Sequence, residues 1–304
     1  MKADWIAVDC MAVDRGKIRL RAVAMGPEAI LAEAQSDDVV GRLAPDGFEP
    51  ALLRLVAPWL GPGVTPVLAC GMVGGPEGWH EVACRTTPCP PLDPDALVTV
   101  PVRDERISVQ IVPGLKQLRP ADVMQGEETR IAGALALHPG FDGAICLPGP
   151  HSRWCQISAG EVVSFQTFLT GEMFALLSEQ SVLRHGLAEG WDDSAFDAGV
   201  AEGMARPDRL MAQLFRIRAE VLIAGLSGPA ARARLSGLLI GAELAAARAW
   251  WLGLPVLLVG SDRLTALYSR ALAAQAVSAR SLSAAGCTLA GLARAAGALS
   301  KAAR

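Results

Sequence analysis

The sequence predicts an α/β protein built from two units, and three observations carry that prediction. The first part of the chain contains short apolar runs that end at glycine or proline, which is typical of strands followed by turns. From about Pro120 onward, the apolar residues recur mostly at helical spacing. A length of 304 residues is enough for two domains with cores of their own. We therefore expect two α/β units that meet near residues 115–122.

Composition and charge exclude several classes of protein. Hydrophobic residues make up 51% of the chain and charged residues 19%, as expected for a soluble globular protein. The net charge of −3 predicts no nucleic-acid partner, because no basic stripe is present to neutralise phosphates. The most apolar stretch, residues 235–260, is interrupted by Glu243, Arg248 and Pro255, whereas a membrane span needs about 20 apolar residues in a row. We therefore expect no membrane association.

Cysteine usage and the first residues bear on the cellular compartment. The seven cysteines form no C-x-x-C pair and are odd in number, which favours reduced thiols. The N-terminal stretch MKADWIAVDC lacks the long apolar segment of a signal peptide. We therefore expect a cytoplasmic protein. The sequence leaves the oligomeric state open, with a homodimer as one alternative.

The first half of the chain is predicted to contain strands and one amphipathic helix. Asp9 is expected to end the first strand, and a second strand follows it as a hairpin. The turn-rich residues 84–104 are expected to be irregular. The predicted strands are residues 5–9, 17–24, 65–70 and 107–112, and the predicted helix is residues 48–60.

The second half is predicted to be mostly helical, with a small set of strands. Thr170 is expected to cap a helix that carries Glu172 in its first turn. The predicted helices are residues 127–137, 170–184, 195–205, 208–224, 231–252, 262–275 and 283–298. The predicted strands are residues 144–147, 153–158, 161–165 and 255–259.

Three separated features place polar residues where a ligand can meet the backbone. Asp9 follows an apolar strand, and Glu127, Glu128 and Thr129 start a helix after Gly126. Gly260-Ser261-Asp262 lies between an apolar strand and a helix, where the N–H groups of the helix start can meet an anion. This arrangement resembles the actin-like sugar-kinase superfamily, in which two ribonuclease-H-like domains close over ATP and a sugar.

Five sequence blocks resemble one family within that superfamily, the 2-dehydro-3-deoxygalactonokinases. Their order along the chain and their spacing are those of the family. The blocks are MVGGPEGWHE (72–81), GEETRIAGALAL (126–137), LPGPHSRW (147–154), FQTFLTGEMFALL (165–177) and LSGLLIGAEL (235–244).

The resemblance implies a domain layout, an activity and its cofactors. Residues 1–118 would form an N-terminal sugar-acid-binding domain and residues 119–304 a C-terminal nucleotide-binding domain, with the site in the cleft between them. The implied activity is phosphorylation of 2-dehydro-3-deoxygalactonate, or of a related 2-keto-3-deoxy sugar acid, with ATP and Mg²⁺. The implied partners are therefore a small sugar acid and a nucleotide.

The resemblance also implies roles for three carboxylates. Glu127 would be the base that takes the proton of the acceptor hydroxyl, with Glu128 as its competitor. Either one is alternatively an ordinary acid of a first helical turn. Asp9 would hold Mg²⁺, largely through water, and is otherwise a turn acid at a strand end.

The remaining candidate residues divide by the group that they would contact, and each has a simpler interpretation as a turn, packing or surface residue. Arg130 and Arg153 would meet the carboxylate of the sugar acid. The other candidates are Gly149, His151 and Ser152 for the γ-phosphate, Gly260 and Ser261 for adenosine, and Gly71, Gly74, Gly78 and Trp79 for the sugar acid.

Two expected phosphate loops depart from the family pattern. After Asp9, Met11, Ala12 and Val13 stand where the family has glycine and hydroxyl residues, and Pro150 replaces a threonine in the second loop. Bulky residues obstruct the approach of backbone N–H groups to phosphate, and proline has no N–H to donate. Gln166 also replaces a family arginine. The sequence therefore carries an alternative hypothesis, a catalytically impaired relative that binds a sugar acid as a sensor or partner protein.

Overall fold

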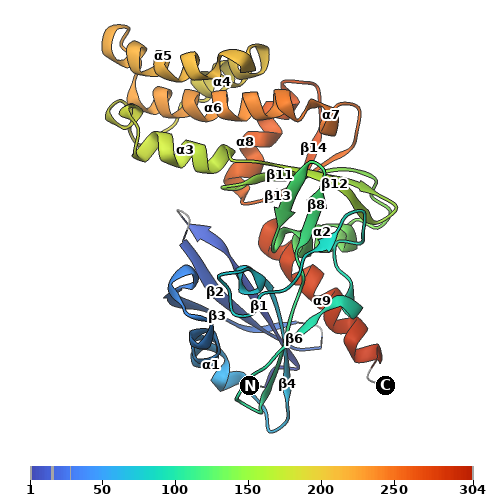
Figure 1. Ribbon diagram of the computed structural model, residues 1–304. Helices are drawn as coiled ribbons and strands as arrows, with labels where there is room; N and C mark the ends of the chain where they lie inside the picture. Colours follow the sequence, from blue (N-terminus) through green and yellow to red (C-terminus); the bar gives the residue numbers. More distant parts are fainter. Residues whose placement is uncertain (1, 15–16, 28, 303–304) are drawn as a thin grey trace. The chain divides into compact units, whose positions relative to one another are not determined.

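The computed structural model describes residues 2–14, 17–27 and 29–302, and the chain divides into two compact units (Figure 1). Unit 1 consists of Met1–Phe141, Ile157–Ser164 and Ala284–Arg304, and unit 2 consists of Asp142–Gln156 and Phe165–Ser283. Unit 1 therefore extends past residue 118, where the sequence places a domain boundary, and it includes the last helix of the chain.

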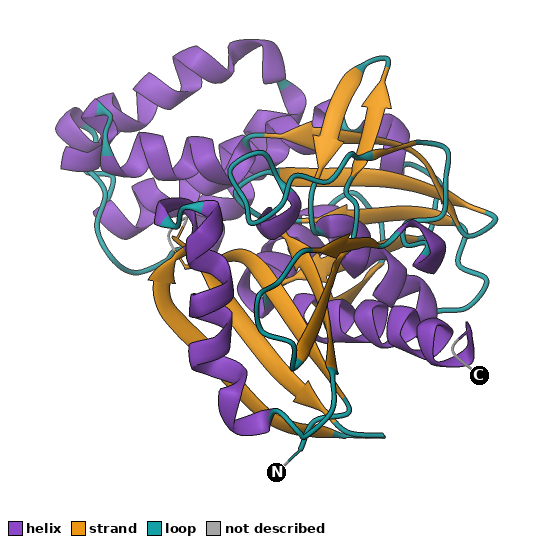
Figure 2. Cartoon of the chain, turned by 60° about the horizontal axis from the view of Figure 1, so that its bottom comes forward, coloured by secondary structure: helices purple, strands orange, loops and turns teal. Residues whose placement is uncertain are grey.

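Unit 1 is built on a six-stranded sheet with the strand order β3-β2-β1-β4-β7-β6. The strands of this sheet are drawn as arrows in the lower part of Figure 1 and again, turned forward, in Figure 2. The first three strands are antiparallel neighbours, whereas β4 runs parallel to β1 and β7 runs parallel to β4. A three-stranded antiparallel ribbon continued by parallel strands is the ribonuclease-H-like arrangement. The strands are β1 (Trp5–Asp14), β2 (Lys17–Met25), β3 (Ile30–Val39), β4 (Thr65–Gly71), β6 (Val98–Val100) and β7 (Ile107–Ile111).

Alternation along β1 gives this sheet two apolar faces. Ile6 and Val8 pack with α1 (Phe48–Val56) and the 3₁₀ turn that follows it (Ala57–Trp59). Ala7, between them, belongs to the core on the opposite face. That second core receives Ala132 from α2 (Glu127–Leu137) and Leu292 and Ala295 from α9 (Ala284–Ala302).

Two glycines let α2 and α9 approach each other closely. A Cβ added at Gly133 would lie 1.7 Å from the carbonyl oxygen of Cys287, and one at Gly291 would lie 2.2 Å from that of Thr129. Such contacts exclude any larger side chain at either position. This packing joins the C-terminal helix to unit 1, which is why the compact unit is not continuous in sequence.

Unit 2 has a five-stranded sheet with the order β12-β11-β10-β13-β14. Three consecutive strands again lie side by side, and β13 and β14 continue the sheet in parallel orientation. Both units thus share one pattern of strand order, and the predicted fold class, two ribonuclease-H-like α/β units, is confirmed. The strands are β10 (Gly143–Leu147), β11 (Ser152–Ser158), β12 (Glu161–Phe168), β13 (Val256–Gly260) and β14 (Ala279–Ser283).

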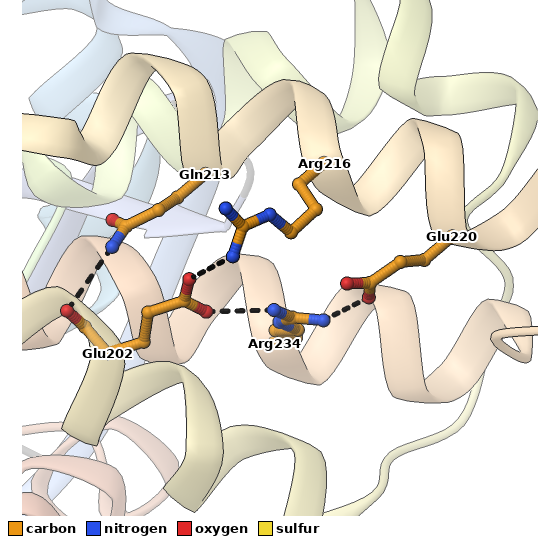
Figure 3. A network of polar contacts seen from close by, with 5 residues as sticks. All are labelled: Glu202, Gln213, Arg216, Glu220 and Arg234. Atoms are coloured by element: carbon orange, nitrogen blue, oxygen red, sulfur yellow. Dashed lines mark hydrogen bonds and ion pairs between the residues drawn. The ribbon is translucent and has the colours of Figure 1, made fainter. Parts of the chain in front are cut away.

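A helical layer completes unit 2. Its helices are α3 (Thr170–Glu179), α4 (Asp193–Ala205), α5 (Leu210–Ile223), α6 (Gly228–Ala246), α7 (Arg248–Trp251) and α8 (Asp262–Ala273). Arg234 of α6 bonds to Glu202 of α4 at 2.8 Å and to Glu220 of α5, and Glu202 also accepts from Arg216 at 3.0 Å (Figure 3). This network joins the three helices. Within the described residues, no helix is long and apolar enough to cross a membrane.

Several expected elements differ in detail from the structure. The first strand does not end at Asp9 but continues to Asp14, because β2 pairs with it along that length. Leu169, not Thr170, is the N-cap of α3, and no side chain caps that helix. The polar strands β3 and β14 were not expected, nor was a small three-stranded sheet of β5 (Arg85–Thr86), β8 (Leu115–Leu118) and β9 (Ala121–Met124).

Candidate active site

Asp9 lies on β1 of unit 1, beside the end of the neighbouring strand β4. Its residue partner on β4 is Cys70, and β4 ends one residue later at Gly71. The Oδ1 atom of Asp9 is buried and has no hydrogen-bond partner among the described residues. Burial raises the pKa of this carboxyl, whereas the charges of Arg130 and Arg21 lower it and that of Glu127 raises it. A buried carboxylate oxygen without a partner is costly and is typical of a site that a ligand completes.

Glu127 and Glu128 begin α2 but have different surroundings. The Glu128 carboxylate is fully buried and accepts hydrogen bonds from the backbone N–H of Gly126 at 2.6 Å and from the Thr129 hydroxyl at 2.9 Å. Burial, and then the charge of Glu127, raise its pKa to about 8. Glu127 keeps partial exposure, and its charge acts on Asp9. Glu127 is thus the more accessible of the two acids.

Two arginines bring positive charge to Asp9. Arg21 lies opposite Asp9 on β2, and its guanidinium is bound to Glu33 at 2.9 Å. Arg130 lies one helical turn after Glu127, and its Nε is buried with no hydrogen-bond partner in the part of the chain that the structure describes. The structure therefore groups Asp9, Glu127 and Arg130 within unit 1, although the sequence places Asp9 and the other two in different domains. It also adds Arg21, which sequence reasoning missed.

The glycine-rich segment after β4 packs beside the start of α2. A Cβ at Gly74 would lie 2.6 Å from Nε2 of Gln125, an atom that is buried and has no partner. Gln125 directly precedes the Gly126 turn, and sequence reasoning missed it because a single glutamine before a glycine carries no pattern. Trp79 is only 8% exposed and stacks on Phe48 with ring centroids 6.2 Å apart, so its ring is part of the core.

In unit 2, the loop between β10 and β11 folds onto the start of α3. The carbonyl oxygen of Pro150 accepts the backbone N–H of Glu172 at 2.9 Å, and His151 Nε2 lies 2.6 Å from the carboxylate of Glu172. A Cβ at Gly171 would lie 2.2 Å from the carbonyl oxygen of Gly149. The loop and the first turn of α3 therefore share one compact arrangement.

The second expected nucleotide segment of unit 2 lies beside this loop. A Cβ at Gly260 would be 3.5 Å from the carbonyl oxygen of Pro148. Ser261 is the N-cap of α8 and is exposed, and its side chain makes no cap hydrogen bond. The structure thus brings Gly149, His151 and Gly260 together within unit 2.

Ser152 and Arg153 both make polar contacts within unit 2. Ser152 is fully buried, and its hydroxyl lies 2.8 Å from that of Tyr268 and bonds to Glu243. Its side chain therefore points into the core of unit 2. Arg153 also belongs to unit 2, and it donates to the carbonyl oxygen of His151 at 3.1 Å.

The donor set at Asp9 fits a magnesium ion. Mg²⁺ takes oxygen ligands, keeps several waters and needs only one or two carboxylates in addition to phosphate oxygens. Asp9 offers a carboxylate oxygen without a partner. No cluster of three or more metal-ligating side chains occurs in the described part of the chain. The residues present therefore suit an ion held in part by waters and substrate oxygens, not a fully protein-bound metal.

Comparisons with known proteins agree with the sequence blocks and the fold. A family model described as 2-keto-3-deoxy-galactonokinase matches residues 14–295. A probable 2-dehydro-3-deoxygalactonokinase of Rhizobium meliloti is 36% identical over 269 residues, which is 86% of this chain and 88% of the relative. A 2-dehydro-3-deoxygalactonokinase of Escherichia coli is 34% identical over 271 residues, which is 87% of this chain and 89% of the relative.

A solved structure of the same family is also similar to this chain. The crystal structure of a putative 2-dehydro-3-deoxygalactonokinase from Sinorhizobium meliloti superposes with a TM-score of 0.89 at 34% identity, covering 97% of this chain and 99% of that one. The match extends over both units. This chain therefore belongs to the 2-keto-3-deoxy-galactonokinase family.

Proposed function

We propose that this protein transfers the γ-phosphoryl group of ATP to 2-dehydro-3-deoxygalactonate. The observation that carries the proposal is the grouping of Asp9, Glu127 and Arg130 in unit 1, where a carboxylate oxygen and a guanidinium Nε are both buried without partners. The relatives named as kinases of this sugar acid supply the substrate. Comparison with them gives no support to a catalytically impaired sensor.

Glu127 is the proposed general base. Phosphoryl transfer depends mainly on positioning and on neutralising charge, and a carboxylate takes the proton of the attacking hydroxyl. Glu127 is partly exposed, although its Oε2 atom is buried, and its other carboxylate oxygen would accept the proton of the substrate hydroxyl. Glu128 is unsuited to this step, because its carboxylate is fully buried and already accepts hydrogen bonds from Gly126 and Thr129.

Asp9 and Arg130 are proposed to handle the charges of the substrates. Asp9 would hold Mg²⁺ through its unpartnered oxygen, and the bound ion would neutralise negative charge on the phosphates. Arg130 would bind the carboxylate of the sugar acid, because its buried Nε lacks a partner that an anion would provide. Arg153 is the alternative for this role.

The nucleotide is assigned to unit 2. Gly149 and His151 would contact the γ-phosphate, and Gly260 and Ser261 would contact adenosine. The helix start at Ser261, which no side chain caps, supports a nucleotide in this unit, because the first N–H groups of a helix can donate to phosphate oxygens. Ser152 would contribute through its backbone, since its hydroxyl is bound to Glu243.

The test is ADP release by the purified protein with Mg-ATP and a panel of 2-keto-3-deoxy sugar acids. We expect turnover that depends on the sugar acid and falls by about 10²–10⁴-fold in Glu127→Gln. Glu105→Gln is the matched control, because Glu105 is an exposed glutamate of the same unit, and it should retain full activity. Turnover that survives in Glu127→Gln would remove this residue from its role. An absence of turnover with every sugar acid would overturn the proposed function.

A further inference from the structure

Glu243, in the LSGLLIGAEL block, is a buried carboxylate that the proposed chemistry does not use. It lies on α6 and is 3% exposed. Trp154 Nε1 donates to its Oε1 at 2.8 Å, and the Tyr268 hydroxyl donates to its Oε2 at 2.7 Å. The side chains of Thr170 and Ser152 also hydrogen-bond to it. Four side chains from three other elements therefore converge on one carboxylate.

The charge of Glu243 is compensated by hydrogen bonds alone. Its partners in the described residues are two hydroxyls of aliphatic side chains, a phenol and an indole, and none of them is a cation. Burial raises the pKa of this carboxyl, and the four hydrogen bonds oppose that rise. A carboxylate has about four lone-pair sites, so these donors saturate it. Removing it would leave several buried hydroxyl and N–H groups without a partner.

The partners of Glu243 come from the three segments assigned to the nucleotide. Ser152 and Trp154 follow the phosphate loop that contains Gly149 and His151. Thr170 is the first residue of α3, whose next two residues contact that loop. Tyr268 belongs to α8, the helix that starts after Ser261. Of the residues proposed to contact ATP, Ser152 binds Glu243 through its hydroxyl, which leaves only its backbone for the nucleotide.

We propose that Glu243 is a positioning residue that holds the phosphate loop, the start of α3 and α8 in the arrangement that binds nucleotide. The inference rests on the proposed function, in that it takes unit 2 as the nucleotide-binding unit. Thr170 is the first residue of α3, and its hydroxyl binds Glu243. The conformation of the phosphate loop thus depends on the side chain of Glu243, which is far from the loop in sequence.

The test compares Glu243→Gln with variants that separate positioning from stability. Glutamine keeps the shape of the side chain but replaces one acceptor oxygen by an N–H₂ group, which must face a hydroxyl or indole donor. Thr170→Val removes a single donor and provides a milder change. Leu238→Ala is the stability control, because Leu238 is a fully buried residue of the same helix that packs in a core away from Glu243.

Four quantities are measured for each variant: the unfolding temperature, the dissociation constant of a non-hydrolysable ATP analogue by calorimetry, the KM for ATP and the KM for the sugar acid. We expect Glu243→Gln to weaken analogue binding and raise the KM for ATP about tenfold, and Thr170→Val about threefold. The KM for the sugar acid should stay within twofold. Leu238→Ala should lower the unfolding temperature and leave all three constants unchanged.

The outcomes separate this inference from the proposed function. If Glu243→Gln and Thr170→Val both fold and bind the analogue as the wild type does, Glu243 has no positioning role. If the wild type binds the analogue but shows no turnover, the proposed reaction fails while the binding comparison still tests Glu243. If Glu243→Gln does not fold, Thr170→Val decides, and unchanged analogue binding in that variant overturns the inference.

Discussion

The Glu128 carboxylate accepts the backbone N–H of Gly126 at 2.6 Å, so this acid is bound at the start of its own helix. Burial raises its pKa to about 8 from an ordinary value of 4.5. The folded state therefore binds the proton of Glu128 more tightly than the unfolded state does. The free energy of unfolding thus falls as the pH rises from 4.5 to about 8.

The first prediction concerns this pH dependence. Glu128→Gln removes the titrating group, so the variant should gain stability relative to the wild type as the pH rises from about 5 to 8.5. We expect the difference in free energy of unfolding to grow by about 2–4 kcal/mol over that range. Urea unfolding at a series of pH values measures it. A difference that stays constant with pH would contradict the raised pKa.

The second prediction is that Asp9 is needed for catalysis but does not stabilise the folded state. Burial raises its pKa, which means that the fold disfavours its charge even with Arg130 and Arg21 nearby. Asp9→Asn should therefore leave the unfolding temperature unchanged or raise it, while kcat falls by about 10²–10³-fold. Asp46→Asn, at an exposed aspartate of the same unit, should change neither quantity. Clear destabilisation of Asp9→Asn would contradict this balance.

The sequence was most informative where local signals and packing agree. The helix expected at residues 127–137 is α2, because a Gly-Glu-Glu start and apolar spacing both favour it. The strands β3 and β14 could not be predicted, because AEAQSDDV and ARSLS are polar edge strands whose hydrogen bonds come from β2 and β13. The sequence also could not predict that α9 packs in unit 1. That packing depends on the close approach of Gly133 and Gly291 to backbone atoms that are distant in sequence.

The candidate site was predictable only in part. Sequence motifs located Asp9, Glu127 and Arg130, which the structure groups, but they could not distinguish Glu127 from Glu128, because the difference lies in burial. The Glu243 network joins residues up to 116 positions apart, such as Ser152 and Tyr268, and no local pattern reports it. The expected effect of residues 11–13 on phosphate binding stays a prediction, because their side chains lie outside the described part of the chain.

The third prediction concerns the contact between Gly171 and the phosphate loop. A Cβ at Gly171 would meet the carbonyl oxygen of Gly149 at 2.2 Å, so Gly171→Ala must displace the loop. We expect a loss of about 1–3 kcal/mol in stability and a raised KM for ATP. Gly297→Ala is the control, because Gly297 is a helical glycine with no atom within 4 Å of an added Cβ. That variant should be more stable by about 0.5–1 kcal/mol, with kinetics unchanged.

The last prediction separates two arginines that share one partner. Arg234 and Arg216 both bond to Glu202, but their side chains are 16% and 54% exposed (Figure 3). Arg234 also binds Glu220, so Arg234→Ala removes this cation from partly buried Glu220 and leaves Glu202 paired with Arg216 alone. We expect it to cost about 2–4 kcal/mol in the free energy of unfolding. Arg216→Ala should cost less than about 1 kcal/mol, because water solvates the groups that it releases.

Urea unfolding of the two variants at low and high salt checks this difference. Screening should reduce the small effect of Arg216→Ala and leave most of the effect of Arg234→Ala, because salt acts weakly on buried pairs. Neither variant should change the KM for ATP or for the sugar acid, since the network lies on α4, α5 and α6 and contacts none of the proposed ligand-binding residues. Equal losses of stability in both variants would show that Glu202, and not the burial of Arg234, determines the strength of this network.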